Sequence, residues 1–138
     1  MKLLMFFCPE FSSTPFKKTI EEGDEDPPSL KVQDAVVVFY HVEEQDEKDQ
    51  GKVLNKAIKN IKWLANKFKT KIIVLHSFNH LSSSKARPSV VPPMVAHIRN
   101  RLEKVGYEVK ETPFGWLNTW TMTVAGESLA KVFKDLSS

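Results

Sequence analysis

The sequence predicts a single α/β domain, in which helices pack on a mixed β-sheet. Residues 34–43 (DAVVVFYHVE) are β-branched, aromatic and almost continuously apolar, which is typical of a central strand. Residues 51–69 carry apolar side chains every three or four positions, which is typical of a helix that packs one face on such a sheet. The chain has 138 residues, 41% of them hydrophobic and 27% charged. These values fit one globular domain over 1–138 rather than a disordered tail.

The first third of the chain contains two or three strands and one acidic loop. Residues 2–8 form a short apolar run followed by a turn signal, which predicts the first strand. Residues 14–20 are expected to be a second strand or an arm. Residues 21–29 (EEGDEDPPS) combine five acids with a glycine and two prolines. We therefore expect a mobile surface loop over about 21–33, before the central strand.

The middle of the chain alternates between helix and strand. Residues 44–50 read as a charged loop, 51–69 as the clearest helix, and 72–76 as another buried strand. The loop 77–93 follows, and 94–105 is predicted as a second helix with Gly106 just beyond its end.

The C-terminal part is predicted as two strands and a helix. Residues 107–111 and 116–124 read as strands, and the second alternates large apolar residues with threonines. Residues 127–136 are predicted as a last short helix, because their apolar positions are spaced by three and four: Leu129, Val132, Phe133 and Leu136.

Charge is segregated along the chain. Residues 21–49 hold eleven acids and two bases, a net charge of −9, whereas residues 50–110 hold thirteen bases and two acids, a net charge of +11. Lysine and arginine neutralise phosphates, so the basic region has two interpretations, a surface facing a polyanion or an ordinary solvated face.

Several classes of protein are excluded or lack support. The longest apolar run is 35–40, too short for a transmembrane helix, and the N-terminus lacks the pattern of a signal peptide. We therefore expect a cytoplasmic protein. One cysteine, Cys8, allows no internal disulfide and is expected to be a buried, inert thiol. No metal site is expected, and the motifs of serine hydrolases, P-loop proteins and Rossmann folds are missing.

Two segments carry candidate chemistry. Residues 78–85 (FNHLSSSK) directly follow a buried strand, where α/β proteins build ligand sites. They are expected either to bind a phosphate or a terminal sugar, or to form a solvent loop. Residues 113–116 (PFGW) form a turn that enters an aromatic strand. Trp116 and Trp120 are interpreted either as a stacking platform for a base or as core aromatics.

Taken together, several segments resemble one family. The resemblance is strongest from about 36 to 136, and the segments that carry it are Val42-Glu43-Glu44, Asp46-Glu47-Lys48, the helix 57–68, Asn79-His80-Leu81-Ser82-Ser83, Arg87-Pro88-Ser89-Val90, Pro113-Phe114-Gly115-Trp116 and Gly126. They resemble the archaeal-type editing domain of threonyl-tRNA synthetase, whose fold is similar to D-aminoacyl-tRNA deacylase.

The resemblance implies hydrolysis of serine wrongly esterified to tRNA(Thr). The family pocket takes the 3′-terminal adenosine and its aminoacyl group, and the adenosine 2′-hydroxyl assists the attacking water. By resemblance, His80 contacts the substrate or positions water, and the remaining pocket residues are Val42, Phe78, Asn79, Phe114, Gly115 and Trp116. The bases expected to contact nucleic acid are Lys52, Lys56, Lys59, Lys85 and Arg87. No cofactor is implied. The expected partners are the tRNA(Thr) 3′ end, the synthetase catalytic chain and a second copy in a homodimer.

The sequence departs from the family pattern at pocket positions. Leu117 and Asn118 stand where the family usually has Tyr-Lys, and Lys131 stands where a glutamate is expected in the last helix. Two alternatives therefore stay open. One is a catalytically weak homologue that binds tRNA or the synthetase, and the other is a deacylase for D-aminoacyl-tRNA or another misacylated tRNA.

Overall fold

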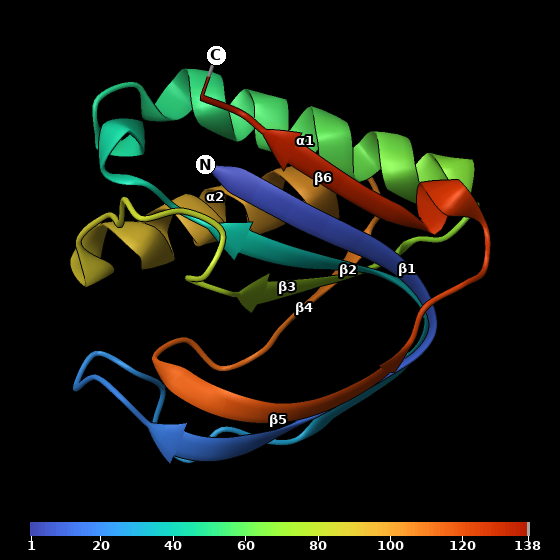
Figure 1. Ribbon diagram of the computed structural model, residues 1–138, viewed down its shortest axis with the longest axis horizontal. Helices are drawn as coiled ribbons and strands as arrows, with labels where there is room; N and C mark the ends of the chain where they lie inside the picture. Colours follow the sequence, from blue (N-terminus) through green and yellow to red (C-terminus); the bar gives the residue numbers. More distant parts are fainter. Residues whose placement is uncertain (138) are drawn as a thin grey trace.

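The computed structural model describes residues 1–137 and shows a six-stranded mixed sheet with two helices on it (Figure 1). This confirms the predicted fold class. The elements are β1 (Lys2–Lys18), β2 (Leu30–His41), α1 (Gln50–Lys67), β3 (Ile72–Ser77), α2 (Val91–Lys104), β4 (Glu108–Glu111), β5 (Trp116–Thr123) and β6 (Lys131–Asp135). Three short 3₁₀ turns, η1 (Glu44–Glu47), η2 (Pro88–Val90) and η3 (Ser128–Ala130), complete them.

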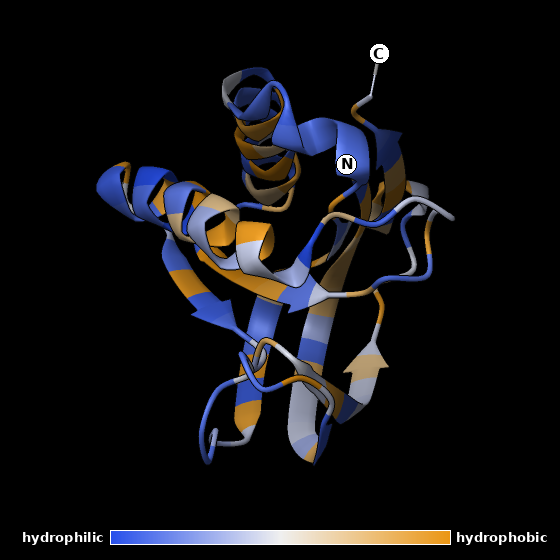
Figure 2. Ribbon diagram, turned by 90° about the vertical axis from the view of Figure 1, so that its left-hand side faces the viewer, coloured by the Kyte–Doolittle hydropathy of each residue, from blue (hydrophilic) through white to orange (hydrophobic). Residues whose placement is uncertain are grey.

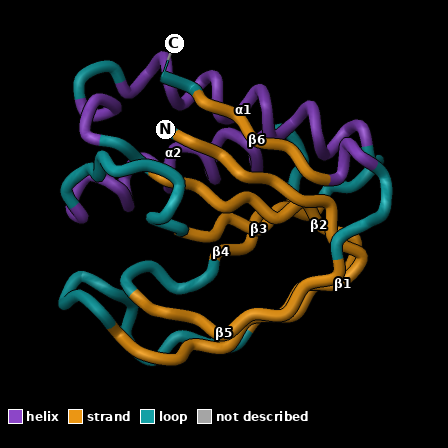
Figure 3. Tube along the Cα trace, viewed as in Figure 1, coloured by secondary structure: helices purple, strands orange, loops and turns teal. Residues whose placement is uncertain are grey.

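The sheet has the strand order β4-β3-β2-β1-β5, and β6 also pairs with β1. The β2–β3 and β3–β4 pairs are parallel, whereas β1 runs antiparallel to all its neighbours. Strand β6 pairs with the first residues of β1, Lys2–Phe6, and β5 pairs with its second half, residues 10–18. The last two strands therefore occupy successive parts of one edge of β1 (Figure 3).

Both long strands bend at the same level. Cys8 and Phe11 of β1 contribute to the same apolar cluster, and so do Val32 and Ala35 of β2. In a regular strand, residues three positions apart point to opposite faces of the sheet. Since the two residues of each strand contribute to one cluster, each strand must turn over between them. Asp34 lies inside the β2 interval with φ of 51°, and its carbonyl accepts a hydrogen bond from the Thr70 hydroxyl. Beyond the bend, β5 and the end of β1 curl away as a separate lobe (Figure 1).

The main core lies between the sheet and the helices. The predicted apolar face of α1 is confirmed, since Ala57, Ile61, Leu64 and Ala65 are fully buried. Apolar positions recur along both helices, which is the pattern of one buried face (Figure 2). Strands β1, β2 and β3 supply the other half of this core. No helix within residues 1–137 is long and apolar enough to cross a membrane.

The predicted helix over 127–136 is wrong. Residues 128–130 form only η3, and residues 131–135 form β6. The spacing of the apolar residues also fits a strand, because Val132 packs on the main core while Phe133 is exposed. The outer edge of β1 offers unpaired backbone groups, and pairing with β6 satisfies them.

Three further boundaries differ from expectation. Strand β2 begins at Leu30, so residues 30–33 of the expected loop 21–33 belong to the strand and pair with β1. Strand β1 continues through residues 9–18, which sequence patterning left undefined except for a strand or arm at 14–20. Helix α2 begins at Val91 rather than Met94, so Pro92 and Pro93 lie in its first turn. Proline is tolerated there because the first backbone N–H groups of a helix have no partner within the helix.

Candidate functional site

A cavity of about 560 Å³ lies beyond the carboxyl ends of β2 and β3, where the start of β5 closes the opposite side. Every residue that the resemblance assigned to the pocket lines it: Val42, Phe78, Asn79, His80, Phe114, Gly115 and Trp116. The fold therefore brings together two segments that are more than 30 residues apart in the sequence. Their individual roles in substrate binding stay predictions.

The loop 78–86 forms one wall and is fastened to the end of β2. The Phe78 amide donates to the Tyr40 carbonyl at 2.9 Å, and the Ala86 amide donates to the Val42 carbonyl at 3.1 Å. His41, which is fully buried, bridges the same loop. Its Nδ1 accepts from the Leu81 amide at 3.1 Å, so Nε2 carries the proton and donates to the Ser84 carbonyl at 2.6 Å. Sequence reasoning missed this role, because His41 sits in a run of buried strand residues.

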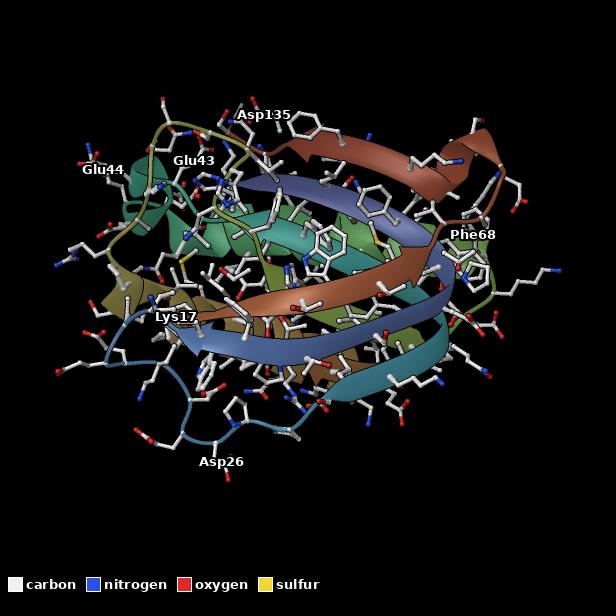
Figure 4. All side chains as sticks on the ribbon, turned by 60° about the horizontal axis from the view of Figure 1, so that its bottom comes forward. Lys17, Asp26, Glu43, Glu44, Phe68 and Asp135 are labelled. Atoms are coloured by element: carbon white, nitrogen blue, oxygen red, sulfur yellow. The ribbon has the colours of Figure 1, made fainter. Side chains whose placement is uncertain are left out.

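Glu43, which is labelled in Figure 4, also holds this wall in place. Its carboxylate accepts hydrogen bonds from the Ser82 hydroxyl at 2.7 Å, the Met1 ammonium at 3.0 Å and Lys2 Nζ at 3.0 Å. Burial alone would raise the pKa of Glu43, but these three donors outweigh it and lower the pKa to about 2. The carboxylate is thus ionised and fully engaged, which suits a structural role.

The opposite wall is the turn 113–116, held by the start of the acidic loop. The Thr19 amide and hydroxyl both donate to the Gly115 carbonyl, at 2.8 and 2.9 Å. Trp116 Nε1 donates to the Asp24 carbonyl at 2.7 Å, and the Phe114 amide donates to the Asp24 carboxylate at 3.2 Å. The expected mobility of the acidic loop stays a prediction, but residues 19–24 are well anchored to the site.

The floor of the cavity contains two aromatic residues from different strands, His76 of β3 and Trp120 of β5. Their ring centroids lie 6.2 Å apart, and the Phe39 ring contacts both, at 4.7 and 5.3 Å. Burial lowers the pKa of His76 to about 4, so the imidazole is neutral at pH 7. Sequence reasoning assigned His76 no role, because no metal site was expected among the histidines.

The charge of the cavity is simple. Among the described residues that line it, Lys85 carries the one permanent charge, and no carboxylate takes part. His80 lies exposed at the rim with its ring 4.9 Å from that of Phe78. Arg87 does not line the cavity, and it pairs with Glu47 at 2.8 Å. Within residues 1–137 no cluster of three or more His, Cys, Asp or Glu residues could hold a metal ion.

The positions that depart from the family pattern behave differently from one another. Asn118 lines the cavity, and its Nδ2 donates to the Trp116 carbonyl at 3.2 Å. That bond fixes the amide orientation, so the buried Oδ1 is left without a partner among residues 1–137. Leu117 is 53% exposed at the cavity edge. Lys131 lies outside the cavity and donates to the Ala125 carbonyl at 2.8 Å.

Cys8 does not line this cavity. Cys8 is fully buried, and burial raises its pKa to about 11. The expected burial is confirmed. The thiol stays protonated at pH 7, which agrees with the prediction that it is inert.

Comparison with known proteins identifies the family. A family model described as the archaea-specific editing domain of threonyl-tRNA synthetase matches residues 1–136. The chain belongs to this editing-domain family.

Individual relatives agree with that assignment. The chain is 30% identical over 139 residues to threonine–tRNA ligase of Methanopyrus kandleri and 33% identical over 138 residues to that of Methanoregula boonei. Each match covers 99% of this chain but 22% of the ligase. The chain therefore spans about a fifth of the length of these relatives.

A solved structure shares the fold of this editing domain. The structure titled "c-Myc DNA Unwinding Element Binding Protein" superposes with a TM-score of 0.71 over 98% of both chains. The identity is 12%, so the likeness shows the fold alone. The fold is the D-aminoacyl-tRNA deacylase-like one that the sequence predicted.

Four of the five bases predicted to contact nucleic acid lie outside the cavity of this editing domain. Lys52 and Lys59 are exposed on α1, and Lys56 Nζ lies 3.5 Å from the Leu136 carbonyl. Of the five predicted bases, Lys85 alone lines the cavity. The predicted bases therefore lie in three places: Lys85 at the cavity rim, Arg87 in an ion pair with Glu47, and the remaining three lysines on α1.

Proposed function

We propose that this chain is an aminoacyl-tRNA deacylase that removes serine from mischarged Ser-tRNA(Thr). Membership of the editing-domain family carries the proposal, together with the gathering of all seven expected pocket residues around one cavity. The synthetase catalytic chain is the expected partner, and the cytoplasm is the expected location, because aminoacylation takes place there.

The cavity supports this substrate in three ways. Its volume of about 560 Å³ lies within the range of ordinary ligand sites. Trp116 and Trp120 offer aromatic surface on which an adenine can stack. Lys85 supplies a cation at the rim, where the phosphate of the terminal nucleotide would lie. The apolar side chain of Val42 and the fastened loop beside it would receive the aminoacyl group.

Hydrolysis of the aminoacyl ester requires little catalytic assistance from the protein. Water attacks the carbonyl carbon of the ester, the tetrahedral oxyanion collapses, and the ribose 3′-oxygen leaves and takes up a proton. Because the ester is intrinsically labile, positioning of water and stabilisation of the oxyanion can supply the rate. His80 is the residue placed to orient water at the rim, on a loop whose backbone is held to the end of β2 at Phe78 and Ala86.

A binding role is the second candidate, and Asn118 favours it. A neutral amide stands where the family usually has a lysine, and its free atom is an acceptor rather than a donor. A missing oxyanion-side donor typically costs about 10²–10³ in rate. A tRNA- or synthetase-binding homologue with weak catalysis would show such a site.

The test is hydrolysis of three esters by the purified chain: Ser-tRNA(Thr), Thr-tRNA(Thr) and a D-aminoacyl-tRNA. Cleavage of the seryl ester that spares the threonyl ester is the expected result. Cleavage of the D-aminoacyl ester alone would replace the proposed specificity, and tRNA binding without any hydrolysis would favour the binding role.

A further inference from the structure

Helix α1 carries an exposed tryptophan that the fold does not require. Trp63 is 46% exposed, although the buried face of α1 is complete without it. The neighbouring core positions Ile61, Leu64 and Ala65 are fully buried. A large aromatic side chain on the solvent side of an amphipathic helix contributes little to folding, so its presence there needs another reason.

The charge around Trp63 is of one sign. Within its bounds α1 contains five lysines and no acid: Lys52, Lys56, Lys59, Lys62 and Lys67. Like charges three or four residues apart destabilise a helix. Helix α2 differs, because its Arg99 pairs with Glu103 and with Glu111 of β4. A face selected only for solubility would gain from such pairs, so the excess of lysine over acid along α1 points to a negatively charged partner.

Helical geometry places these side chains in one stripe. At 100° per residue, Lys52, Lys59 and Trp63 fall within about 40° of one another on the side away from the core. Lys67 continues the stripe about one turn beyond Trp63. Lys56 lies beside the stripe, where its Nζ approaches the Leu136 carbonyl at 3.5 Å. From Lys52 to Lys67 the stripe is about 22 Å long, which is enough to span several phosphates.

The stripe begins at the same end of the molecule as the cavity. Turn η1 leads directly into α1, and it is tied to the wall of the cavity by two contacts. The Glu44 amide donates to the Ser84 hydroxyl at 3.0 Å, and Arg87 pairs with Glu47. Lys85 lies between these contacts at the rim. A strand of RNA that leaves the cavity past Lys85 therefore meets the N-terminal end of α1 next.

We propose that the outward stripe of α1, made by Lys52, Lys59, Trp63 and Lys67, is a docking surface for RNA. The lysines contact phosphates, and Trp63 stacks on an unpaired base. Lysine alternating with an exposed aromatic is how single-stranded RNA is held without sequence readout. The identity of the RNA as tRNA rests on the proposed function, but the surface itself rests on the exposure and charge of α1.

The test is the salt dependence of binding to deacylated tRNA, measured by fluorescence anisotropy from 50 to 200 mM KCl. Trp63→Ala is expected to weaken binding about 5- to 10-fold and to leave the salt slope unchanged, because stacking releases no counterions. Lys52→Gln and Lys59→Gln are each expected to reduce the salt slope by about 0.7–0.9. Trp63→Phe should recover most of the affinity lost in Trp63→Ala.

The controls come from the rest of the surface. Lys31→Gln on β2 removes an exposed lysine outside α1, and Phe133→Ala removes an exposed aromatic from β6. Neither is expected to change affinity or slope beyond twofold, and urea midpoints for all variants check the fold. Equal effects in the α1 variants and these controls would overturn the docking surface, as would absence of tRNA binding by the parent chain. Hydrolysis of a seryl-adenosine ester in the same samples tests the proposed function separately.

Discussion

Gly115 is the residue on which the geometry of one cavity wall depends most directly. Its φ is +77°, and a Cβ added there would lie 2.7 Å from Gly23 Cα and 2.7 Å from Ile20 Cγ1. Gly106 has φ of +98° but open space around it, and Gly126 has neither constraint. The three alanine variants therefore separate backbone strain from steric clash.

The expected losses follow from these surroundings. A left-handed conformation costs a non-glycine residue about 1–2 kcal/mol, which is the whole expected effect of Gly106→Ala. Gly115→Ala carries the same strain and also pushes back the segment 19–24. That movement lengthens the hydrogen bonds from Thr19 and Trp116, at about 1 kcal/mol each. We expect a total loss of about 3–4 kcal/mol for Gly115→Ala and less than about 0.5 kcal/mol for Gly126→Ala.

Urea unfolding at pH 7 measures these differences. In Gly115→Ala, residues 19–24 could instead detach locally from the turn 113–116. Their backbone amides would then exchange faster, and the urea midpoint would fall by less than the expected loss of stability implies. Equal midpoints and equal exchange in the Gly115→Ala and Gly106→Ala variants would refute the packing of Gly115 against Gly23.

Four other predictions concern charge and chemistry. The pKa of His76 is lowered from 6.5 to about 4 in the folded chain. As the pH falls, the unfolded chain therefore takes up this proton before the folded chain does. The free energy of unfolding should fall by about 3 kcal/mol between pH 6.5 and 4. The pKa of Glu43 is lowered from 4.5 to about 2, so a further loss of about 3 kcal/mol is expected between pH 4.5 and 2. Glu43→Gln should shrink the loss in this range and leave the step between pH 6.5 and 4 unchanged, because Asp135, whose pKa is also lowered, supplies the remainder; an undiminished loss below pH 4.5 would contradict the assignment. Asn118→Lys replaces the unpartnered acceptor with a cation and should raise seryl-tRNA hydrolysis at least about 10-fold in single-turnover assays, whereas an unchanged rate would mean that the site works in another way. His80→Ala should lower the same rate about 10²-fold while tRNA affinity changes less than twofold, and a loss of affinity instead would make His80 a binding residue.

Sequence patterning predicted the centre of the fold well. The alternation and apolar runs of β2, β3 and β5 and the periodicity of α1 are local signals, and each of these elements was found, although β2 begins at Leu30 rather than at residue 34. The failure at 127–136 arose because an apolar spacing of three and four also fits a strand with one buried side. Only the unpaired edge of β1 decides between them, and that edge is a tertiary feature.

The candidate site was predicted by resemblance rather than by periodicity. Short motifs at 78–80 and 114–116 located both walls, although nothing in their spacing shows that they face each other. His41 and His76 were hidden inside strands, where a histidine cannot be told from an ordinary core residue. Their contacts with the Ser84 carbonyl and the Thr112 hydroxyl depend on loops that close only in the folded chain.

The central claim is that the cavity holds the aminoacylated 3′-adenosine of tRNA. The most direct measurement is titration of the chain with a non-hydrolysable seryl-adenosine amide, followed by NMR of the tryptophan indole and histidine ring signals. The account predicts saturable shifts of Trp116, Trp120 and His80, whose side chains line the cavity, with Trp63 unmoved as an internal control. Shifts confined to Trp63, or no shift at all while intact tRNA still binds, would contradict it.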